Sequence, residues 1–115
     1  MKKAEMEIRN VPFQVADWSK VPKVEHPGVS GTSFWRTLEM GNIRVRFVEY
    51  SAGFRSDHWC ERGHVLLVLE GELTIELKDG REFRLVRGMS FQAADDASNP
   101  HLALAMNGAT VFIVD

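Results

Sequence analysis

Disulfides and membrane spans are both missing from this sequence. Its 115 residues contain one cysteine, Cys60, which cannot form an internal disulfide. This is typical of a protein in a reducing compartment. No apolar run approaches the roughly 18 residues of a transmembrane helix, and the first residues, MKKAEMEIRN, have no apolar stretch of signal-peptide length. We therefore expect a cytoplasmic protein with no membrane partner.

A strong excess of charge is also missing. Fourteen lysines and arginines face sixteen aspartates and glutamates, which gives a formal net charge of −2. Such a balance offers no electrostatic reason to bind nucleic acid, so we expect no nucleic-acid partner. Hydrophobic residues make up 44% of the chain, enough for a real core, and 115 residues is the length of one domain. We expect a single domain over residues 1–115.

Sustained helical periodicity is absent, and short β-type runs separated by turn residues fill the second half. The first of these runs is 42–50. The next, 64–80, is expected to form two strands joined around Glu70-Gly71, with a turn at Asp79-Gly80. The remaining runs are 81–88, 89–94, 101–108 and 110–115. Short strands at this spacing predict a β-sandwich or barrel. We expect the core barrel over 42–115.

The run NIRVRFVEY alternates with period two. It places Ile43, Val45 and Phe47 on one face and Arg44 and Arg46 on the other. Because the apolar face needs a core, we expect the arginines in solvent. The alternative is a barrel interior in which the two guanidinium groups bind a substrate carboxylate.

Residues 1–41 have a different character. Pro12, Pro22 and Pro27 predict an extended N-terminal arm with turns that leads into the first strands. Trp18 and Trp35 are expected to seal this arm onto the barrel, since aromatic packing is the default role of such residues.

The stretch DHWCERGH, residues 57–64, gathers the chain's one cysteine and two of its four histidines. If DHWC is a strand, His58 and Cys60 project to the same face. His64 then opens the next strand, and His101 begins a later one. Imidazole and thiolate groups converging from separate strands suit Zn²⁺, Fe²⁺, Ni²⁺ or Cu, so we expect a metal site of His58, Cys60, His64 and His101.

These residues resemble the first motif of the cupin superfamily, G-x5-H-x-H-x3/4-E-x6-G. The chain reads Gly53-x4-His58-x-Cys60-x3-His64-x6-Gly71, with Cys60 at the second histidine position and His64 at the glutamate position. The second motif is weaker: it starts at Gly88, has Ala94 and Asp96 in place of its proline and glycine, reaches His101 two residues late and has Ala105 or a neighbour in place of its asparagine. Over most of its length the chain is similar to small cupins of the DHCW-motif type, in the stretches VPF, HPG, FWRT, GNIRVRFVEY, DHWC and LEGEL. Its order is D-H-W-C rather than D-H-C-W.

The resemblance implies an all-β, double-stranded β-helix (jelly-roll) cupin barrel with any metal near one open end. It leaves the function open between classes. One is a metal-dependent oxygenase, isomerase or lyase acting on a small organic molecule. Another is a non-enzymatic sensor or accessory module, and a third is a metal-free barrel that serves association. The predicted cofactor is Zn, Fe or Ni, with Cu also compatible.

The direction of the Cys60 side chain decides how open such a site is. Four protein ligands close the coordination shell, whereas three leave a position for substrate. A twist or bulge at Cys60 rotates the thiol outward and leaves a site of three histidines. A Cys–His nucleophile pair is the rival reading, but no helix follows Cys60 to supply oxyanion donors.

Strand phase also predicts which side chains line the pocket and which face outward. The expected lining of an apolar substrate pocket is Leu66, Val68, Phe91 and Met106. The outward set is too apolar for water and predicts a second sheet or a homodimer face: Val65, Leu67, Leu69, Phe112 and Val114.

Overall fold

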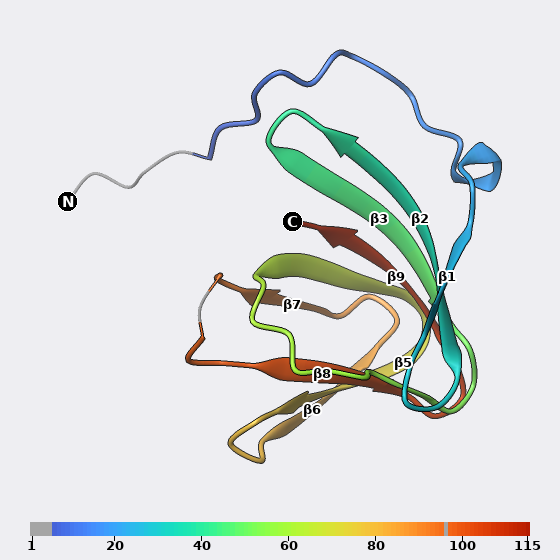
Figure 1. Cartoon of the computed structure of the whole chain (residues 1–115), viewed down its shortest axis with the longest axis vertical. Coiled ribbons are helices and arrows are strands. Elements are labelled where there is room, and N and C mark those ends of the chain that lie inside the picture. The colour runs from blue at the N-terminus through green and yellow to red at the C-terminus, as the bar shows by residue number, and fades with distance from the viewer. Residues whose placement is uncertain (1–5, 96) are drawn as a thin grey trace.

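Antiparallel strands dominate the chain in a computed structural model that describes residues 6–95 and 97–115 (Figure 1). The strands are β1 (Val24–Pro27), β2 (Thr32–Met40), β3 (Ile43–Tyr50), β4 (Phe54–Arg55), β5 (His64–Leu77), β6 (Glu82–Val86), β7 (Ser90–Ala93), β8 (His101–Ala105) and β9 (Ala109–Val114). A short 3-10 turn, η1 (Trp18–Lys20), precedes them. The described part of the chain has no helix of the length and apolarity that crossing a membrane requires. The first five residues of the predicted arm, and Asp96 of the second motif, lie outside the described residues.

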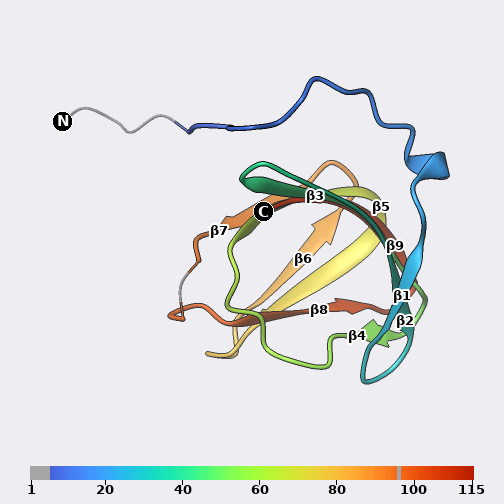
Figure 2. The ribbon, with the colours of Figure 1, turned by 45° about the horizontal axis from the view of Figure 1, so that its top comes forward.

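Two sheets form the walls of the barrel, and β5 belongs to both. One sheet runs β1-β2-β3-β9-β5-β7 and the other runs β6-β5-β8-β4. Figure 2 shows the sheets curling around a common interior. Closing the sheets on each other buries one face of each, which is the stable arrangement for strands of this kind. The predicted jelly-roll barrel is confirmed.

The long strand β5 corrects the prediction of two strands joined at Glu70-Gly71. It is continuous over 14 residues, with a β-bulge between Val68 and Glu70 opposite β9. Gly71 has a φ of 77°, and a Cβ there would overlap the carbonyl of Gly108, so only glycine fits. The turn signal therefore marks the bend where β5 passes from one sheet to the other.

The two faces of β3 are reversed relative to the prediction. Arg46 is 5% exposed and Val48 is fully buried, so the arginine face points into the barrel. Phe47 lies on the outer face, where Trp18 of the arm stacks on it with ring centroids 6.2 Å apart. Because the arm shields this outer apolar face, the face does not need the barrel core. The expectation of solvent-exposed arginines is wrong.

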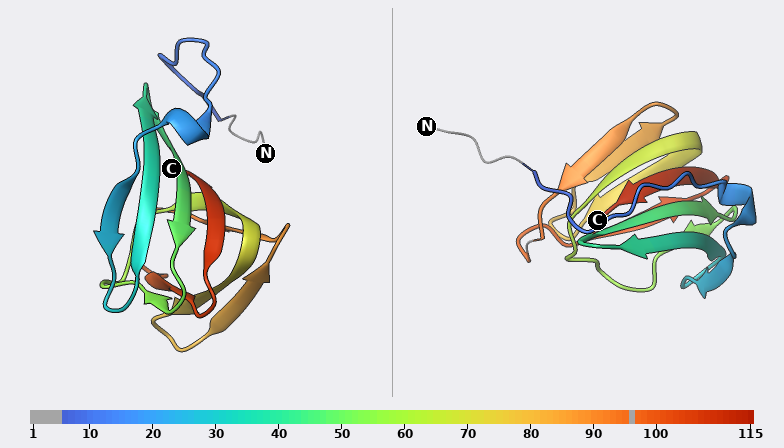
Figure 3. Two further views of the ribbon diagram at one scale, coloured as in Figure 1. Left: turned by 90° about the vertical axis from the view of Figure 1, so that its right-hand side faces the viewer. Right: turned by 90° about the horizontal axis from the view of Figure 1, so that it is seen from above.

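The N-terminal arm runs outside β2 and β3, as two further views show (Figure 3). Arg36 of β2 holds it by donating hydrogen bonds to the carbonyls of Trp18 and Val21 at 3.0 and 2.7 Å. Trp18 also contacts Phe112 edge-on at 5.8 Å. The sealing role predicted for Trp18 agrees with these contacts. It is wrong for Trp35, which lies on β2 and faces the barrel interior, where it borders the cavity described below.

The outward apolar set is only partly covered by the arm. Phe112 packs against Trp18, whereas Val65 and Leu67 of β5 stay exposed. The homodimer face remains a prediction.

Candidate metal centre

Three of the four predicted ligands meet inside the barrel. Cys60, His64 and His101 each offer one candidate ligand atom, and these three atoms all lie within 4.8 Å of one another. Cys60 and His101 are directly opposite each other: the Cys60 amide donates to the His101 carbonyl at 2.7 Å, and the His101 amide donates back at 3.0 Å. This isolated bridge joins the 56–63 loop to β8 and so holds the thiol beside the imidazole.

The backbone just before β5 places the third residue, His64. The Gly63 amide donates to the Asp95 carboxylate at 2.7 Å. A Cβ on Gly63 would overlap the backbone of Ala93 and Ala94, so glycine is needed where the loop passes β7. His64 is thereby fixed as the first residue of β5, paired with Ala93.

Each imidazole has an acceptor on one nitrogen and turns the other toward its neighbour. His64 Nδ1 lies 3.3 Å from Asp115 Oδ2, and His101 Nδ1 lies 3.4 Å from the Asn99 carbonyl. The two Nε2 atoms face each other at 2.9 Å. Carboxylate and carbonyl partners on Nδ1 are the usual orienting groups of metal-bound histidines, because they fix the tautomer that leaves Nε2 free to bind.

Burial keeps both imidazoles neutral. Burial first, and then the proximity of His101, lower the pKa of His64 to about 4. Burial also lowers the pKa of His101. Both rings are therefore unprotonated at neutral pH, which is the state that binds metals.

Asp115 organises the cavity wall beside His64. Its side chain is 1% exposed and accepts from Arg44 through Nε and Nη2, at 2.8 and 2.9 Å, and from Arg46 Nη2 at 2.9 Å. Arg62 lies farther away, with Nε 3.5 Å from Oδ2. Burial alone would raise the pKa of Asp115, but the hydrogen bond from Arg44 and the charges of Arg46 and Arg44 outweigh it and lower the pKa to about 2.

A cavity of about 680 Å³ opens beside these groups. It is bordered by the three candidate ligands together with Trp35, Arg44, Arg46, Tyr50, Arg62, Leu66 and Phe91, among others. Of the four predicted lining residues, Leu66 and Phe91 border it. Val68 is in the core, and Met106 is 75% exposed at the surface. The cavity is more charged than the apolar pocket predicted, because the arginine face of β3 points inward.

His58 stands apart from the other predicted ligands. Its side chain is 76% exposed, and its Nδ1 lies 2.6 Å from Asp57 Oδ1. The assumption that DHWC is a strand is wrong: residues 57–59 form a bend and loop, and only Cys60 makes a β-bridge. Without strand alternation, His58 and Cys60 need not share a face. The structure assembles a Cys/His/His group, with His58 at the cavity's edge.

The assembled donors fit a first-row transition metal. Ligand atoms of one tetrahedral ion lie about 3.3–3.7 Å apart, given bonds of about 2.0–2.3 Å. The 2.9 Å Nε2–Nε2 distance and the 4.8 Å limit for the group bracket that range. One thiol and two neutral imidazoles suit Zn, Fe, Ni or Cu. Three protein ligands leave one coordination position open, and a small molecule in the cavity can occupy it.

Asp115, Trp35 and Tyr50 are parts of the site that sequence reasoning missed. Asp115 had one available signal: a charged residue directly after the apolar run TVFIV. Burial raises the pKa of Tyr50 to about 12, so its hydroxyl stays protonated at the cavity. For Trp35 the local sequence gives no direction, because its inward orientation depends on pairing with β3.

Comparison with known proteins places the barrel among solved structures. No protein-family model matches the chain, and none of the curated proteins matches it. The chain does match the structure of an RmlC-like cupin from Shewanella frigidimarina, with a TM-score of 0.71 and 17% identity over 91% of each chain. The barrel has the cupin fold.

Two other solved structures share this cupin fold. An ectoine synthase from P. lautus matches with a TM-score of 0.71 and 16% identity, over 89% of this chain and 76% of its own. A cupin-superfamily sugar phosphate isomerase from Silicibacter pomeroyi matches with a TM-score of 0.69 and 19% identity, over 88% and 74%. The cupin fold and the Cys/His/His group together support a metal-binding protein of cupin type. The DHCW-motif subtype stays a prediction.

Proposed function

We propose that this cupin binds a transition-metal ion through Cys60, His64 and His101 and is a metal-dependent enzyme for a small organic molecule held in the adjacent cavity. The reaction is of oxygenase, isomerase or lyase type. One observation carries the proposal: the Nε2 atoms of His64 and His101 face each other at 2.9 Å while both Nδ1 atoms already have acceptors.

That arrangement is unfavourable without a cation. If each Nδ1 carries its ring's proton and donates it to Asp115 or to the Asn99 carbonyl, both Nε2 atoms present lone pairs to each other. Two acceptors at hydrogen-bond distance repel unless a proton or a metal ion lies between them. Since burial opposes protonation of both rings, a metal ion is the better partner. The Cys60 thiol stands beside them as a third donor.

The surrounding residues hold the donors and shape the cavity. Phe91 contacts both imidazoles edge-on, with ring centroids 5.7 Å from His64 and 5.5 Å from His101, and so limits their rotation and keeps water from that side. Asp115 orients His64 and is itself held by Arg44 and Arg46. A bound metal ion would supply Lewis acidity toward a molecule in the cavity.

A set of three protein ligands favours a catalytic metal site over a closed structural one. Catalytic sites keep a coordination position for water or substrate, whereas structural zinc sites use four protein ligands. His58, the fourth predicted ligand, faces Asp57 and solvent instead. The alternative, a metal- or ligand-binding sensor or accessory cupin, uses the same three residues and is separated from an enzyme by turnover.

The test is metal content in protein purified without an affinity tag and reconstituted under reducing conditions. We expect about one metal ion per chain in the wild type, and its loss in Cys60→Ser, His64→Gln and His101→Gln. His58→Gln is the matched control and should keep the metal, because its ring is outside the group. Substitution with Co²⁺ adds a thiolate charge-transfer band if Cys60 binds.

Three results would contradict the proposal: no metal in the reconstituted wild type, metal retained in the His64 and His101 variants, or metal lost in His58→Gln alone. If metal binds as expected, turnover of candidate substrates decides between enzyme and sensor.

A further inference from the structure

An unusual balance of charge lies inside the barrel, next to the candidate metal centre. The side chains of Arg44 and Arg46 are 19% and 6% exposed, and the carboxylate between them, that of Asp115, is 1% exposed. One buried and one half-buried guanidinium group thus face a single buried side-chain carboxylate. The other acidic groups bordering the cavity, Asp57 and Glu61, are exposed to solvent, which screens them.

Arg46 is the cation whose hydrogen-bonding capacity is least used. Arg44 spends two donors on Asp115, whereas Arg46 gives Asp115 one, from Nη2. Within the described residues, the buried Nε of Arg46 has no hydrogen-bond partner. A guanidinium group carries five N–H donors, and buried donors without partners are costly. Burial and the neighbouring charge of Arg44 lower the pKa of Arg46, and Asp115 offsets this only in part.

An aromatic stack fixes the Arg46 guanidinium at the cavity wall. The guanidinium carbon lies 4.4 Å from the ring centroid of Trp35. The ring of His26 also stacks on Trp35, with 3.9 Å between centroids and 26° between planes. Trp35 is itself anchored, since its Nε1 donates to the Ser33 hydroxyl at 2.9 Å. A planar guanidinium group that borders the cavity and has an unpartnered donor is suited to bind a carboxylate.

This guanidinium is also close to the metal ligands. Arg46 Nη2 and His64 Nδ1 both contact Oδ2 of Asp115, at 2.9 and 3.3 Å. A single carboxylate oxygen therefore separates the two groups. Tyr50 borders the same cavity, and its hydroxyl stays protonated because burial raises its pKa to about 12.

We infer that the molecule bound in this cavity carries a carboxylate group and that Arg46, backed by Trp35, binds that carboxylate beside the Cys60, His64 and His101 centre. This inference rests on the proposed function for its metal-bound form. It goes further by naming the chemical class of the ligand and the residue that selects it. The cavity volume of about 680 Å³ lies within the range of small-molecule sites.

The test compares carboxylates with neutral molecules of the same shape. Zinc-loaded wild type is titrated by calorimetry with pyruvate and benzoate, and with pyruvamide and benzamide. The same titrations are run on metal-free protein. We expect each acid to bind at least about tenfold more tightly than its amide, because a charge-assisted hydrogen bond in a buried site is worth that much.

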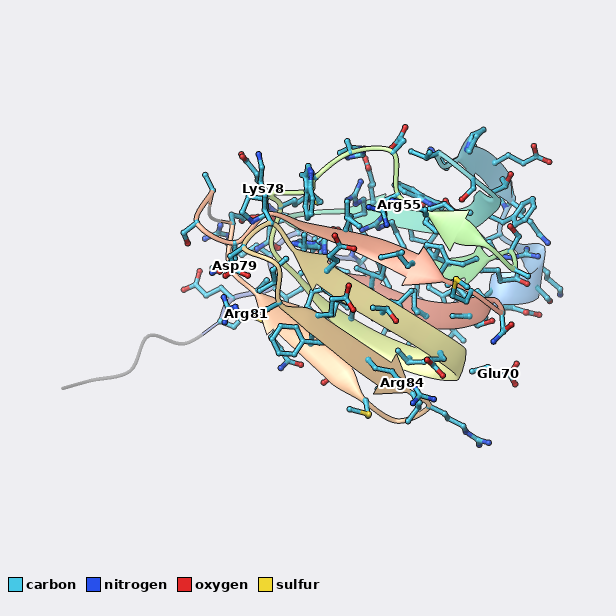
Figure 4. The ribbon with its side chains drawn as sticks, turned by 90° about the horizontal axis from the view of Figure 1, so that it is seen from below. Arg55, Glu70, Lys78, Asp79, Arg81 and Arg84 are labelled. Carbon is cyan, nitrogen blue, oxygen red and sulfur yellow. The ribbon has the colours of Figure 1, made fainter. Side chains whose placement is uncertain are left out.

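Variants then separate Arg46 from the metal. Arg46→Gln should lower carboxylate affinity about tenfold or more and leave amide binding and zinc content unchanged. Arg46→Lys keeps the charge but loses the planar guanidinium group, so its carboxylate affinity should lie between those of the wild type and Arg46→Gln. Arg84→Gln is the matched control: this arginine lies on the outer side of β6, paired with Glu72, and should not affect binding (Figure 4).

Several outcomes would overturn the inference. These are equal affinity for acid and amide, no carboxylate binding by the wild type at millimolar concentration, or wild-type carboxylate affinity in a folded Arg46 variant. If Arg46→Gln does not fold, the acid–amide comparison in metal-free wild type still decides, because no zinc ion is then present to attract the carboxylate. A wild type that holds no zinc contradicts the metal proposal, and the titration of metal-free protein then tests the arginine site separately.

Discussion

Replacing Asp115 with asparagine removes the carboxylate that Arg44 and Arg46 share. Asparagine has nearly the same shape and keeps one acceptor oxygen, so the change is mainly one of charge. Arg46 is then left buried without a counter-ion, since Asp115 is the group with which it forms an ion pair in the described structure. We expect a folded but clearly less stable protein.

The size of the effect follows from the pKa of Asp115. Its carboxyl has a pKa of about 2 in the folded protein, against an ordinary value of 3.8. At about 1.4 kcal/mol per pKa unit, this shift corresponds to about 2.5 kcal/mol of stabilisation at neutral pH. Removing one partner of a buried pair typically costs about 3–5 kcal/mol, because the remaining charge is uncompensated. The free energy of unfolding should therefore fall by about 2.5–5 kcal/mol.

The assay is urea unfolding of metal-free protein followed by tryptophan fluorescence, at a series of pH values. A carboxyl with a lowered folded-state pKa stabilises the protein fully above its unfolded-state pKa, near pH 4. That stabilisation is lost as the pH falls through the folded-state pKa, near pH 2. The difference between wild type and Asp115→Asn should thus be constant above pH 4.5 or so and shrink toward pH 2.

Asp79→Asn provides the control. Asp79 pairs with Arg81 at the exposed turn before β6, on the outside of the barrel, and its loss should change stability far less (Figure 4). Equal destabilisation by the two substitutions would refute the reasoning. So would a difference between wild type and Asp115→Asn that persists unchanged to pH 2.

Three further substitutions test the fold and the geometry of the site. Trp18→Ala should cost about 2 kcal/mol in urea unfolding, because two phenylalanine rings lose their cover, and no change would show that the arm does not stabilise the barrel. Gly63→Ala should cost about 1–3 kcal/mol and weaken zinc binding, since its Cβ overlaps the backbone of Ala93 next to His64; unaltered zinc affinity would contradict this. Leu73→Ala in the core should lower the free energy of unfolding by about 2–5 kcal/mol. A smaller loss would indicate that the barrel relaxes to fill the space left by the missing side chain.

The barrel could be predicted because its signals are local. The period-two alternation of 42–50 and the turn residues between later runs each report on a few neighbouring residues. The turn signal at Gly71 is ambiguous, because a glycine with positive φ occurs at a β-bulge as well as in a hairpin turn. Only the pairing of β5 with β9 distinguishes the two.

The candidate site was predictable in its donor types but not in its geometry. Cys60, His64 and His101 were identifiable as donors from their chemistry and spacing. His58 was grouped with them on the assumption that alternate residues share a face, and this holds only in a strand. The bend at Asp57-His58 turns its ring to solvent.

The sequence is sufficient to predict an all-β barrel, an arm sealed by Trp18, and a supply of thiol and imidazole donors. Which face of β3 lies inside the barrel depends on the tertiary structure. Alternation divides the strand into two faces, but burial depends on what covers each: Trp18 covers Phe47, and Asp115 balances Arg46 from a position 69 residues away. A buried charge is stable only with a partner, and long-range pairing of strands supplies that partner.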